Sequence, residues 1–565
     1  MSKRPLEILS ILFLFCFLHP VNLCAGDCQT RSLHRLSINH DYTCIDINTI
    51  QMWFSNDGRG SYDLNWSHGG LYWPKGSNKT AVFSDGLIWG GRVDGRLQVN
   101  GSVSNPSLQA GPIIGTGANA RPDNPLDPRH RIYRIQKNWR SLKTQNQTLY
   151  AQFRNDYLQW PGNLGAPSVD KNSNGRWDPP QLDSQDHLVG GDVPSFIGDQ
   201  QLWFVSNDLN PDLTRLTFNS DPLGLEVQCL VWGYDDSGPL GNAVFKKYTV
   251  INKGAKTVDS MYLAYWSDPD LGSAVDDLSG CDTLLNLGFV YNGLDPDAIY
   301  GSAPPALGYD FLQGPIVRTS TAADSAMFAF GHRSGYKNLP MTAFMFYLCG
   351  GDPVYSEPTS AIQMYRSFHG LSATTGEPIS DPTTGQSTRF ALAGDPVTGT
   401  GWVDGMAPGR CGERYLLMSS GSFKLVPGDT QEIVIGISIA QGNDRLSSVT
   451  AMKDNDREMQ AFYDHFTPSD DSPPYEIPGG YSLGQNYPNP FNSTTSIEFS
   501  LPNAGFVRLS IFDLCGKKVC TVVEDGLPRG TYNVRWKPSN VATGIYFYRL
   551  EAGEIVQTRK STLLK

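Results

Sequence analysis

The sequence predicts a mainly β, multi-domain protein. Its β-rich body, expected to be built from β-sandwiches with one late helix, precedes a C-terminal β-sandwich. Composition is the first observation behind this prediction: the 565 residues include 58 glycines and 38 prolines, and aspartate provides 44 of the 56 acidic residues. Aspartate, glycine and proline favour turns, whereas helices favour glutamate. The second observation is that short segments with alternating apolar residues recur, as expected of strands with one buried face.

The N-terminus has the features of a cleavable signal peptide. Lys3 and Arg4 precede an apolar run from Ile8 to Leu18. That run is shorter than the roughly 20 apolar residues that a membrane span needs. Small residues predict cleavage after Gly26, so we expect residues 1–26 to be removed and the mature chain to be exported without a transmembrane span.

The rest of the chain is expected to form three folded parts and a linker. Residues 27–190 form an N-terminal β-rich region, residues 191–466 a second β-rich domain, and residues 481–565 the C-terminal sandwich. The linker at 467–480 contains prolines, serines and aspartates that break regular structure.

Strands and one helix are predicted within the body. The helix runs from Ser447 to Phe466, where apolar residues recur at near-helical spacing and a serine is available as N-cap. The strand-like segments are Leu202–Ser206, Glu226–Tyr234, Ala243–Asn252, Ser260–Ser267, Ala343–Leu348 and Gln431–Ala440. Tryptophans near the N-terminus, such as Trp66, Trp73 and Trp89, are expected to pack between sheets, although aromatic rings also stack on sugars.

The C-terminal region shows short strands separated by glycines, which indicates a β-sandwich. The strands are expected at Thr495–Leu501, Phe506–Asp513, Lys518–Val523, Thr531–Trp536 and Gly544–Leu550. Eight cysteines remain after cleavage, and the local candidates for disulfides are Cys28 with Cys44 and Cys515 with Cys520.

A motif at the start of this region carries a family resemblance. The motif consists of Asn486, Tyr487, Pro488, Asn489, Pro490, Phe491 and Asn492, and the chain closes on Lys565. It resembles the type IX secretion system C-terminal sorting domain, which is described as similar to the Ig-like domain of flagellar hook-capping proteins. The resemblance implies an Ig-like fold, an outer-membrane secretion and sorting machinery as partner, and a location outside the cell or on its surface.

The body resembles uncharacterised secreted proteins that carry the same terminal domain. The similarity lies in residues 199–208 and 265–272. It supplies no activity.

A loop with the spacing of calcium ligands lies at 170–178. Oxygen-bearing side chains stand at loop positions 1, 3, 5 and 9, glycine stands at position 6, and one position contributes a backbone carbonyl. The expected ligands are Asp170, Asn172, Asn174, Asp178 and the carbonyl of Arg176. Position 12 is Gln181, so Asp183 or Asp186 would complete the shell. We expect structural calcium here; the alternative is a metal-free turn.

A second acidic group follows the strand that ends near Trp266. Its members are Asp268, Asp270, Asp276, Asp277 and Asp282. Such carboxylates repel one another unless they are solvated, hydrogen-bonded or metal-bound. An exposed acidic loop, a calcium site, and a carboxylate pair for glycoside hydrolysis all remain open.

The net charge and the motifs reduce the number of functions that the chain could have. The formal charge of −11 argues against a nucleic-acid partner. A serine pattern around Ser482 lacks a later histidine, so it is no nucleophile. We therefore expect a secreted or cell-surface protein of structural or binding type, with a glycan or surface protein as partner. The alternative is an extracellular hydrolase acting on carbohydrate.

Overall fold

A computed structural model provides the structure of the chain. It describes residues 39–564 except 66–67, 104, 322, 349–353, 406–411, 467–480, 487, 503–504, 528–529, 539–540 and 554. The predicted signal peptide and linker, together with Tyr487 and Lys565, lie outside the described residues. Strands make up 45% of the chain and helices 14%, which confirms the mainly β class. Within the described part, no helix is long and apolar enough to cross a membrane.

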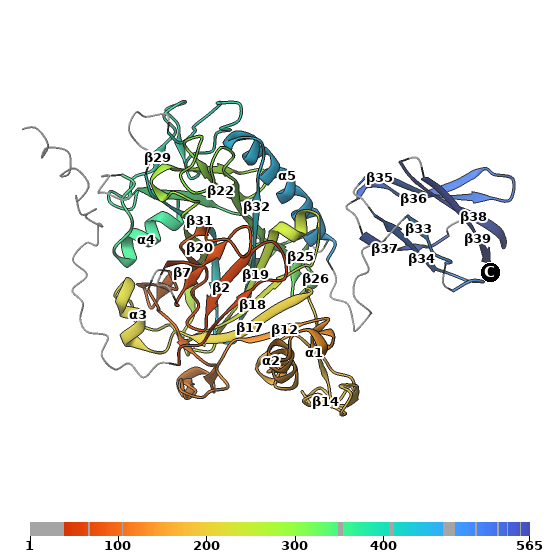
Figure 1. Cartoon of the computed structure of the whole chain (residues 1–565), viewed down its shortest axis with the longest axis horizontal. Coiled ribbons are helices and arrows are strands. Elements are labelled where there is room, and N and C mark those ends of the chain that lie inside the picture. Colours follow the sequence, from red (N-terminus) through yellow and green to blue (C-terminus); the bar gives the residue numbers. More distant parts are fainter. Residues whose placement is uncertain are drawn as a thin grey trace, which may run out of the picture.

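The body is a sandwich of two large antiparallel sheets (Figure 1). The five-stranded sheet has the order β28 (Ala343–Leu348), β31 (Arg414–Leu425), β20 (Val258–Asp268), β7 (Ser84–Val93) and β8 (Arg96–Gly101). The nine-stranded sheet has the order β12 (Tyr133–Gln136), β17 (Gln200–Asn207), β18 (Leu225–Gly233), β19 (Ala243–Asn252), β32 (Thr430–Ala440), β23 (Ala306–Gln313), β22 (Leu287–Asn292) and β21 (Asp277–Asp282), and β9 (Gln109–Ala110) pairs with β17.

Smaller sheets surround the sandwich. A four-stranded sheet contains β1 (Tyr42–Ile45), β2 (Gln51–Ser55), β5 (Leu71–Tyr72) and β6 (Thr80–Val82). Two-stranded ribbons pair β3 (Tyr62–Asp63) with β4 (His68–Gly69), β10 (Ile113–Ile114) with β11 (Arg121–Pro122), β13 (Ser168–Val169) with β16 (Val193–Pro194), β14 (Gln181–Leu182) with β15 (Leu188–Gly190), β24 (Ile316–Arg318) with β27 (Tyr336–Asn338), β25 (Ser325–Phe328) with β26 (Gly331–Ser334), and β29 (Ile379–Ser380) with β30 (Ser387–Thr388).

The main core fills the space between the two large sheets. Tyr265 of β20 packs against Tyr309 of β23, with ring centroids 5.7 Å apart. Beside them, the fully buried Lys246 of β19 donates to the equally buried Asp85 of β7 at 2.6 Å. Trp89 is fully buried in this core, which confirms its expected packing role. The two sheets are thus joined by aromatic contacts and by one buried ion pair.

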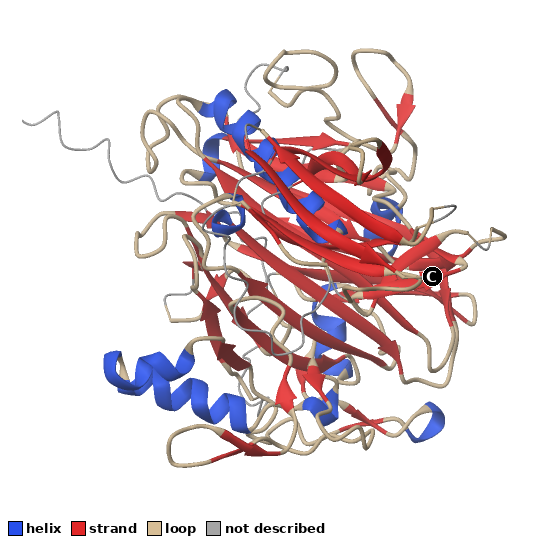
Figure 2. Cartoon of the chain, turned by 90° about the vertical axis from the view of Figure 1, so that its right-hand side faces the viewer, coloured by secondary structure: helices blue, strands red, loops and turns tan. Residues whose placement is uncertain are grey.

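Helices cover the outer face of the nine-stranded sheet. Figure 2 shows helices lying outside the strand layers. The long helix α5 (Arg445–Asp464) contacts β23 and β32, and its Met459 joins a second core that also includes residues of α2 (Gln147–Leu158). The other helices are α1 (Leu142–Gln145), α3 (Pro211–Thr217) and α4 (Ala361–Phe368).

The expected boundary between residues 190 and 191 does not separate two sheets. β7 belongs to the N-terminal region, yet it pairs along its length with β20 of the second region. One continuous core also contains residues from Ile45 to Ile439. The division into 27–190 and 191–466 is therefore corrected: both regions contribute strands to one sandwich.

The C-terminal domain has a hydrophobic core of its own. One sheet has the order β33 (Ser482–Leu483), β34 (Thr495–Leu501) and β37 (Gly530–Trp536). The other has the order β36 (Lys518–Leu527), β35 (Gly505–Asp513), β38 (Gly544–Ala552) and β39 (Ile555–Leu563). This arrangement confirms the predicted C-terminal β domain. Cys515 and Cys520 are free, so this candidate disulfide is not formed; Cys28 lies outside the described residues.

Candidate functional site

The opening motif of the C-terminal domain is tied to distant strands. Asn486 is buried, and its side-chain amide donates to the Thr495 hydroxyl at 2.9 Å. Its backbone amide donates to the hydroxyl of Tyr548, in β38, at 2.8 Å. Pro488 is exposed, but its carbonyl accepts the Thr495 hydroxyl at 2.8 Å. These bonds fix the motif against the sandwich.

The second half of the motif pairs with the final strand. The amide of Phe491 donates to the carbonyl of Thr562 at 2.9 Å, and the amide of Leu564 donates to the carbonyl of Phe491 at 2.8 Å. The buried Phe491 ring lies 5.3 Å from Trp536 between centroids. Asn489 accepts the Thr562 amide at 2.9 Å. Pro490 and Asn492 are exposed.

Comparison with known families shows which family this domain matches. Residues 485–563 match the secretion system C-terminal sorting domain. The predicted type IX resemblance is thereby confirmed. The sorting domain indicates export of the chain to the cell surface or the extracellular space, and it implies interaction with the type IX secretion machinery.

Other comparisons leave the activity of the body open. The chain is similar to a polysaccharide lyase, with 10% identity over 60% of this chain and 34% of the other and a TM-score of 0.18. It is also similar to dimeric latent PorU from Porphyromonas gingivalis, with 10% identity over 64% of this chain and 31% of the other and a TM-score of 0.13. The chain spans about a third of the length of these structures, and TM-scores this low carry no argument. No curated protein matches the chain.

The loop at 170–178 folds around its own polar side chains. The carboxylate of Asp170 accepts the amides of Asn174 at 3.3 Å and Gly175 at 2.7 Å. The side-chain amides of Asn172 and Asn174 both donate to one oxygen of Asp178, at 2.9 and 2.8 Å. The side chains expected to bind calcium therefore converge, and the loop surface is exposed.

Buried Asp192 holds the two ends of this loop together. Its carboxylate accepts the amides of Lys171 at 2.9 Å and Asp178 at 2.8 Å. Asp186, expected as an alternative ligand, instead accepts from Arg154 at 2.7 Å and Lys143 at 3.1 Å. Asp186 is therefore engaged elsewhere.

Asp183, the other alternative ligand, also has partners outside the loop. Its carboxylate accepts the backbone amides of Gln185 at 2.8 Å and His187 at 2.9 Å. The amide of Arg176 donates to the side-chain oxygen of Asn174 at 2.7 Å.

The acidic group after β20 is not an exposed loop. Asp268 is 6% exposed, Asp276 4% and Asp277 fully buried, so that interpretation is wrong for these residues. Asp282 is half-buried, and its carboxylate accepts from Lys453 at 2.9 Å. Each of Asp268, Asp276 and Asp277 has one carboxylate oxygen without a hydrogen-bond partner among the described residues.

A carboxylate triad forms at one end of the five-stranded sheet. One oxygen each from Asp268, Asp270 and Glu413 lies within 4.8 Å of the other two. β20 ends at Asp268, and the adjacent β31 begins directly after Glu413. The triad thus contains two of the predicted acidic residues and Glu413, which the sequence did not suggest. Asp276 and Asp277 are not members.

The triad has an unusual electrostatic environment. Burial, followed by the charges of Asp270 and Glu413, raises the pKa of Asp268 well above its ordinary value. Burial and Glu413 raise the pKa values of both Asp270 and Glu357 to about 7. These carboxyls therefore resist ionisation while the site holds no cation.

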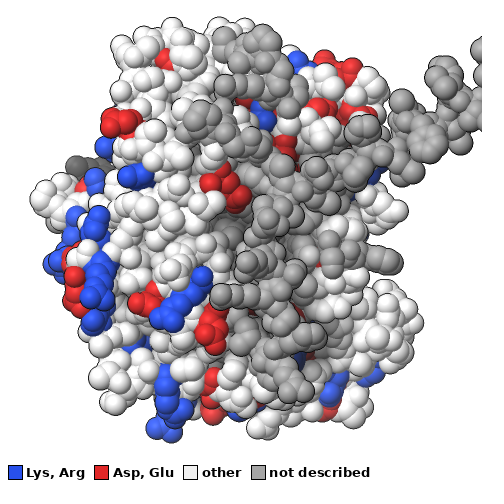
Figure 3. Space-filling view, turned by 90° about the vertical axis from the view of Figure 1, so that its left-hand side faces the viewer, with Lys and Arg blue, Asp and Glu red and all other residues white. Residues whose placement is uncertain are grey.

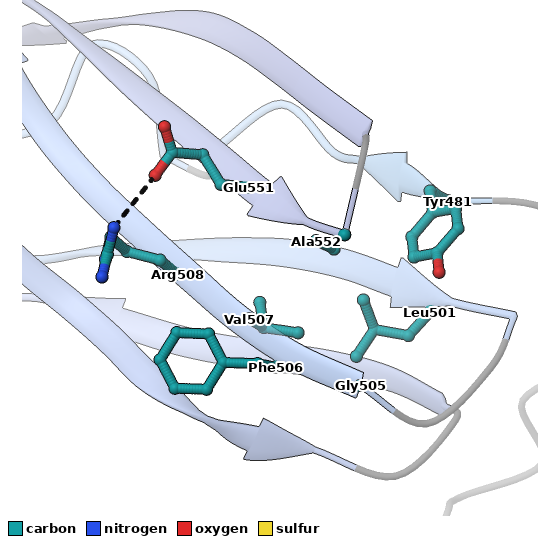
Figure 4. A pocket seen from close by; sticks show the side chains of 9 residues that line it. Tyr481, Leu501, Gly505, Phe506, Val507, Arg508, Glu551 and Ala552 are labelled. Carbon is teal, nitrogen blue, oxygen red and sulfur yellow. Dashed lines mark ion pairs between the residues drawn. The ribbon is translucent and has the colours of Figure 1, made fainter.

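Neither of two cavities is lined by a triad residue. One, of about 490 Å³, lies in the sorting domain. Figure 4 shows that Tyr481 lies on the opposite side of it from Arg508 and Glu551, whose ion pair is 3.8 Å long. Phe506 is 58% exposed. This cavity lies close to the start of the described sorting domain.

The second cavity, of about 480 Å³, lies in the body. It is lined by Phe346, Tyr355 and Trp402 beside the buried ion pair of Asp404 and Arg414, whose Nε–Oδ2 distance is 2.8 Å. Phe346 and Tyr355 stack with centroids 4.6 Å apart. The cavity thus combines aromatic faces with a charged pair.

Proposed function

We propose that this chain is a cell-surface protein of structural or binding type, whose β-sandwich body is delivered by its sorting domain. The observation that carries this proposal is the match at residues 485–563. The separate core of that domain supports its action as a transferable unit. On the face drawn in Figure 3, acidic and basic side chains are interspersed, which fits a role outside nucleic-acid binding.

The test is export of a reporter. Residues 481–565 are fused behind a reporter with a signal peptide, in a host that has a type IX system. The reporter is expected at the cell surface or in the medium. A matched fusion that ends before Ile555 lacks β39 and is expected to stay in the periplasm. Periplasmic retention of the intact fusion would contradict the proposed sorting role.

Calcium at the loop 170–178 is proposed as a structural staple of the body. The converging oxygens of Asp170, Asn172, Asn174 and Asp178 support it, since calcium collects such ligands. The side-chain amides that now donate to Asp178 would turn their oxygens toward the ion. The carbonyl of Arg176 completes the expected set. Loss of one bound calcium in an Asp170→Asn/Asp178→Asn variant tests this site.

A glycan or a surface protein is the proposed partner of the body. The aromatic cavity of Phe346, Tyr355 and Trp402 supports a glycan, because sugar rings pack on aromatic faces and bond to charged groups. Glycan-array binding of the body is the test, with Trp402→Ala as the variant and buried-core Trp89→Phe as a control for folding. Equal binding by Trp402→Ala and the unchanged chain would contradict this cavity as the site.

An extracellular carbohydrate hydrolase is the second proposed function. The close approach of Asp268, Asp270 and Glu413 supports it, because retaining glycosidases hold two carboxyl groups about 5–5.5 Å apart. It ranks second because neither cavity described above is lined by these residues. Hydrolysis in a glycan screen that disappears in Asp268→Ala or Asp270→Ala would favour it over the first proposal.

A further inference from the structure

Two neighbouring strand ends bring the triad together. β20 and β31 are antiparallel partners, with Ser267 opposite Leu416. Asp268, the last residue of β20, and Asp270, just beyond it, therefore lie beside Glu413, which directly precedes β31. Sheet register, rather than a flexible acidic loop, determines this convergence.

Asp268, a member of the triad, has a buried oxygen without a hydrogen-bond partner among the described residues. Asp268 is only 6% exposed, and its Oδ1 atom has no hydrogen-bond partner in the described part of the chain. The Oδ1 atom of Asp270 is also without a partner there. Carboxylates removed from water cost several kcal/mol each unless a charge or hydrogen bond compensates them.

The surroundings of Asp268 add negative charge. After burial, the strongest influences on its pKa are the carboxylates of Asp270, Glu413, Glu357 and Asp277, and each raises it. Bound protons or a bound cation can relieve this repulsion. A cation does so for all three oxygens at once, because it sits between them.

We propose that Asp268, Asp270 and Glu413 are the protein ligands of a bound divalent cation, and that this cation is calcium. Carboxylate oxygens without nitrogen or sulfur suit a hard cation. Calcium binds oxygens at about 2.3–2.6 Å in flexible geometry, so two oxygens on one ion lie at most about 4.6–5.2 Å apart, and the three triad oxygens all lie within 4.8 Å of one another. Magnesium needs about 2.0–2.1 Å and near-ideal octahedral geometry. Water completes the calcium shell.

An aromatic pair positions one ligand. The Tyr415 hydroxyl donates to Oε1 of Glu413 at 2.9 Å, and the Tyr415 ring stacks on Trp266 with centroids 5.9 Å apart. Tyr415 is therefore a positioning residue. The ion joins the segment after β20 to the start of β31. This site lies on other elements than the proposed calcium loop, so the full chain binds two calcium ions if both proposals hold.

The decisive experiment counts calcium ions. Chelator-treated mature chain, 27–565, is dialysed against calcium, and bound ions per chain are measured. Glu413→Gln and Asp268→Asn are expected to lose one ion, and the loop variant Asp170→Asn/Asp178→Asn a different one. The matched control is Asp221→Asn, an exposed aspartate paired with Arg215.

The outcomes separate the two sites. If the loop fails to bind, the unchanged chain holds one ion and Glu413→Gln holds none, which still supports the triad. If Glu413→Gln and Asp268→Asn retain every ion of the unchanged chain, the proposal is overturned. Tighter or equal binding of magnesium at the triad would overturn its assignment to calcium.

Terbium luminescence gives a second readout. Terbium takes calcium positions, and Trp266 near the triad transfers excitation to it. Emission measured in the Asp170→Asn/Asp178→Asn background is expected to fall at least several-fold on Glu413→Gln. Circular dichroism confirms that each variant folds. If calcium leaves the melting temperature unchanged in that background and Asp268→Asn raises it in metal-free buffer, the triad holds protons and the proposal fails.

Discussion

Two acidic regions of the body differ in how their carboxylates are compensated. In the loop at 170–178 most side chains are exposed, and donation from the side-chain amides of Asn172 and Asn174 lowers the pKa of Asp178. In the triad, burial and neighbouring carboxylates raise the pKa of Asp268. The loop is stable as an ionised turn, whereas the triad needs a proton or a cation.

The two regions also differ in how far they can be recognised from the sequence. The proposed ligands of the loop come from nine consecutive residues, so their spacing is visible in the sequence. The triad joins Asp268 and Asp270 to Glu413, a distant glutamate with no acidic neighbour in its own segment. Fold topology, and not spacing, creates the second arrangement.

Calcium removal gives the largest expected contrast between the regions. In Asp170→Asn/Asp178→Asn, which leaves only the triad, chelation is expected to destabilise the body by about 2.7 kcal/mol relative to calcium at 100 times its Kd. In Glu413→Gln, which leaves only the loop, we expect a smaller change at the same calcium concentration. The loop carboxylates are already hydrogen-bonded, so the loop is expected to bind calcium more weakly. Calorimetry with and without chelator measures both. A larger chelator effect in Glu413→Gln would reverse the comparison.

The pH dependence of stability should also distinguish them. The folded pKa of Asp270, about 7, lies above its unfolded value, so the folded state binds more protons between these values. Without calcium, stability is full below pH of about 4 and falls as pH rises through about 7. The loop is expected to show the opposite pH dependence. Because the pKa of Asp178 is lowered in the folded state, the folded loop loses stability as pH falls and Asp178 becomes protonated. Thermal melts across pH, with and without calcium, test this; a metal-free chain that gains stability from pH 5 to 7.5 would contradict it.

A buried acid pair elsewhere sharpens the comparison. Asp310 of β23 and Asp456 of α5 are fully buried, and burial raises the pKa of Asp456 to about 7. Asp456→Asn supplies a permanent donor to Asp310, so we expect about 1–2 kcal/mol of stabilisation at pH of about 8, independent of calcium. The control is Asp454→Asn, an exposed change on the same helix. Denaturant unfolding measures the stability of both variants. If the effect of Asp456→Asn depended on calcium, the buried pair would not differ from the triad in the way proposed.

The smallest expected effect concerns the loop backbone. Gly175 has φ of +73°, and a Cβ there meets nothing within 4 Å. Gly175→Ala should therefore cost only about 1 kcal/mol through backbone strain. Its calcium affinity at the loop should fall while terbium emission at the triad stays unchanged. Gly335→Ala, another open positive-φ position, is the matched control.

Regular strands of the body were predictable because their pattern is local. β19 and β28 have the predicted bounds, since alternating or continuous apolar residues end at clear turns. The late helix begins at Arg445 with Asp444 as N-cap, and Ser447 completes the capping box from inside the helix. The serine was therefore part of the cap, but it was not the cap itself.

Long-range features were not predictable. Helix α2 was missed because it buries only part of one face, including Phe153 and Tyr157. The single sandwich was missed because pairing of β7 with β20 depends on residues far apart in sequence. Glu413 became a member of the triad only through the pairing of β20 with β31. Local propensity carries no information about such pairings.

The pairing of Phe491 with Thr562 and Leu564 has a consequence for synthesis. A chain grows from its N-terminus, so the opening motif of the sorting domain emerges before the strand that fixes it. A product truncated before residue 555 would carry the motif without β39, and its Phe491 would lose these bonds. Recognition of the folded domain would then act as a proofreading step that admits finished chains and rejects prematurely terminated ones.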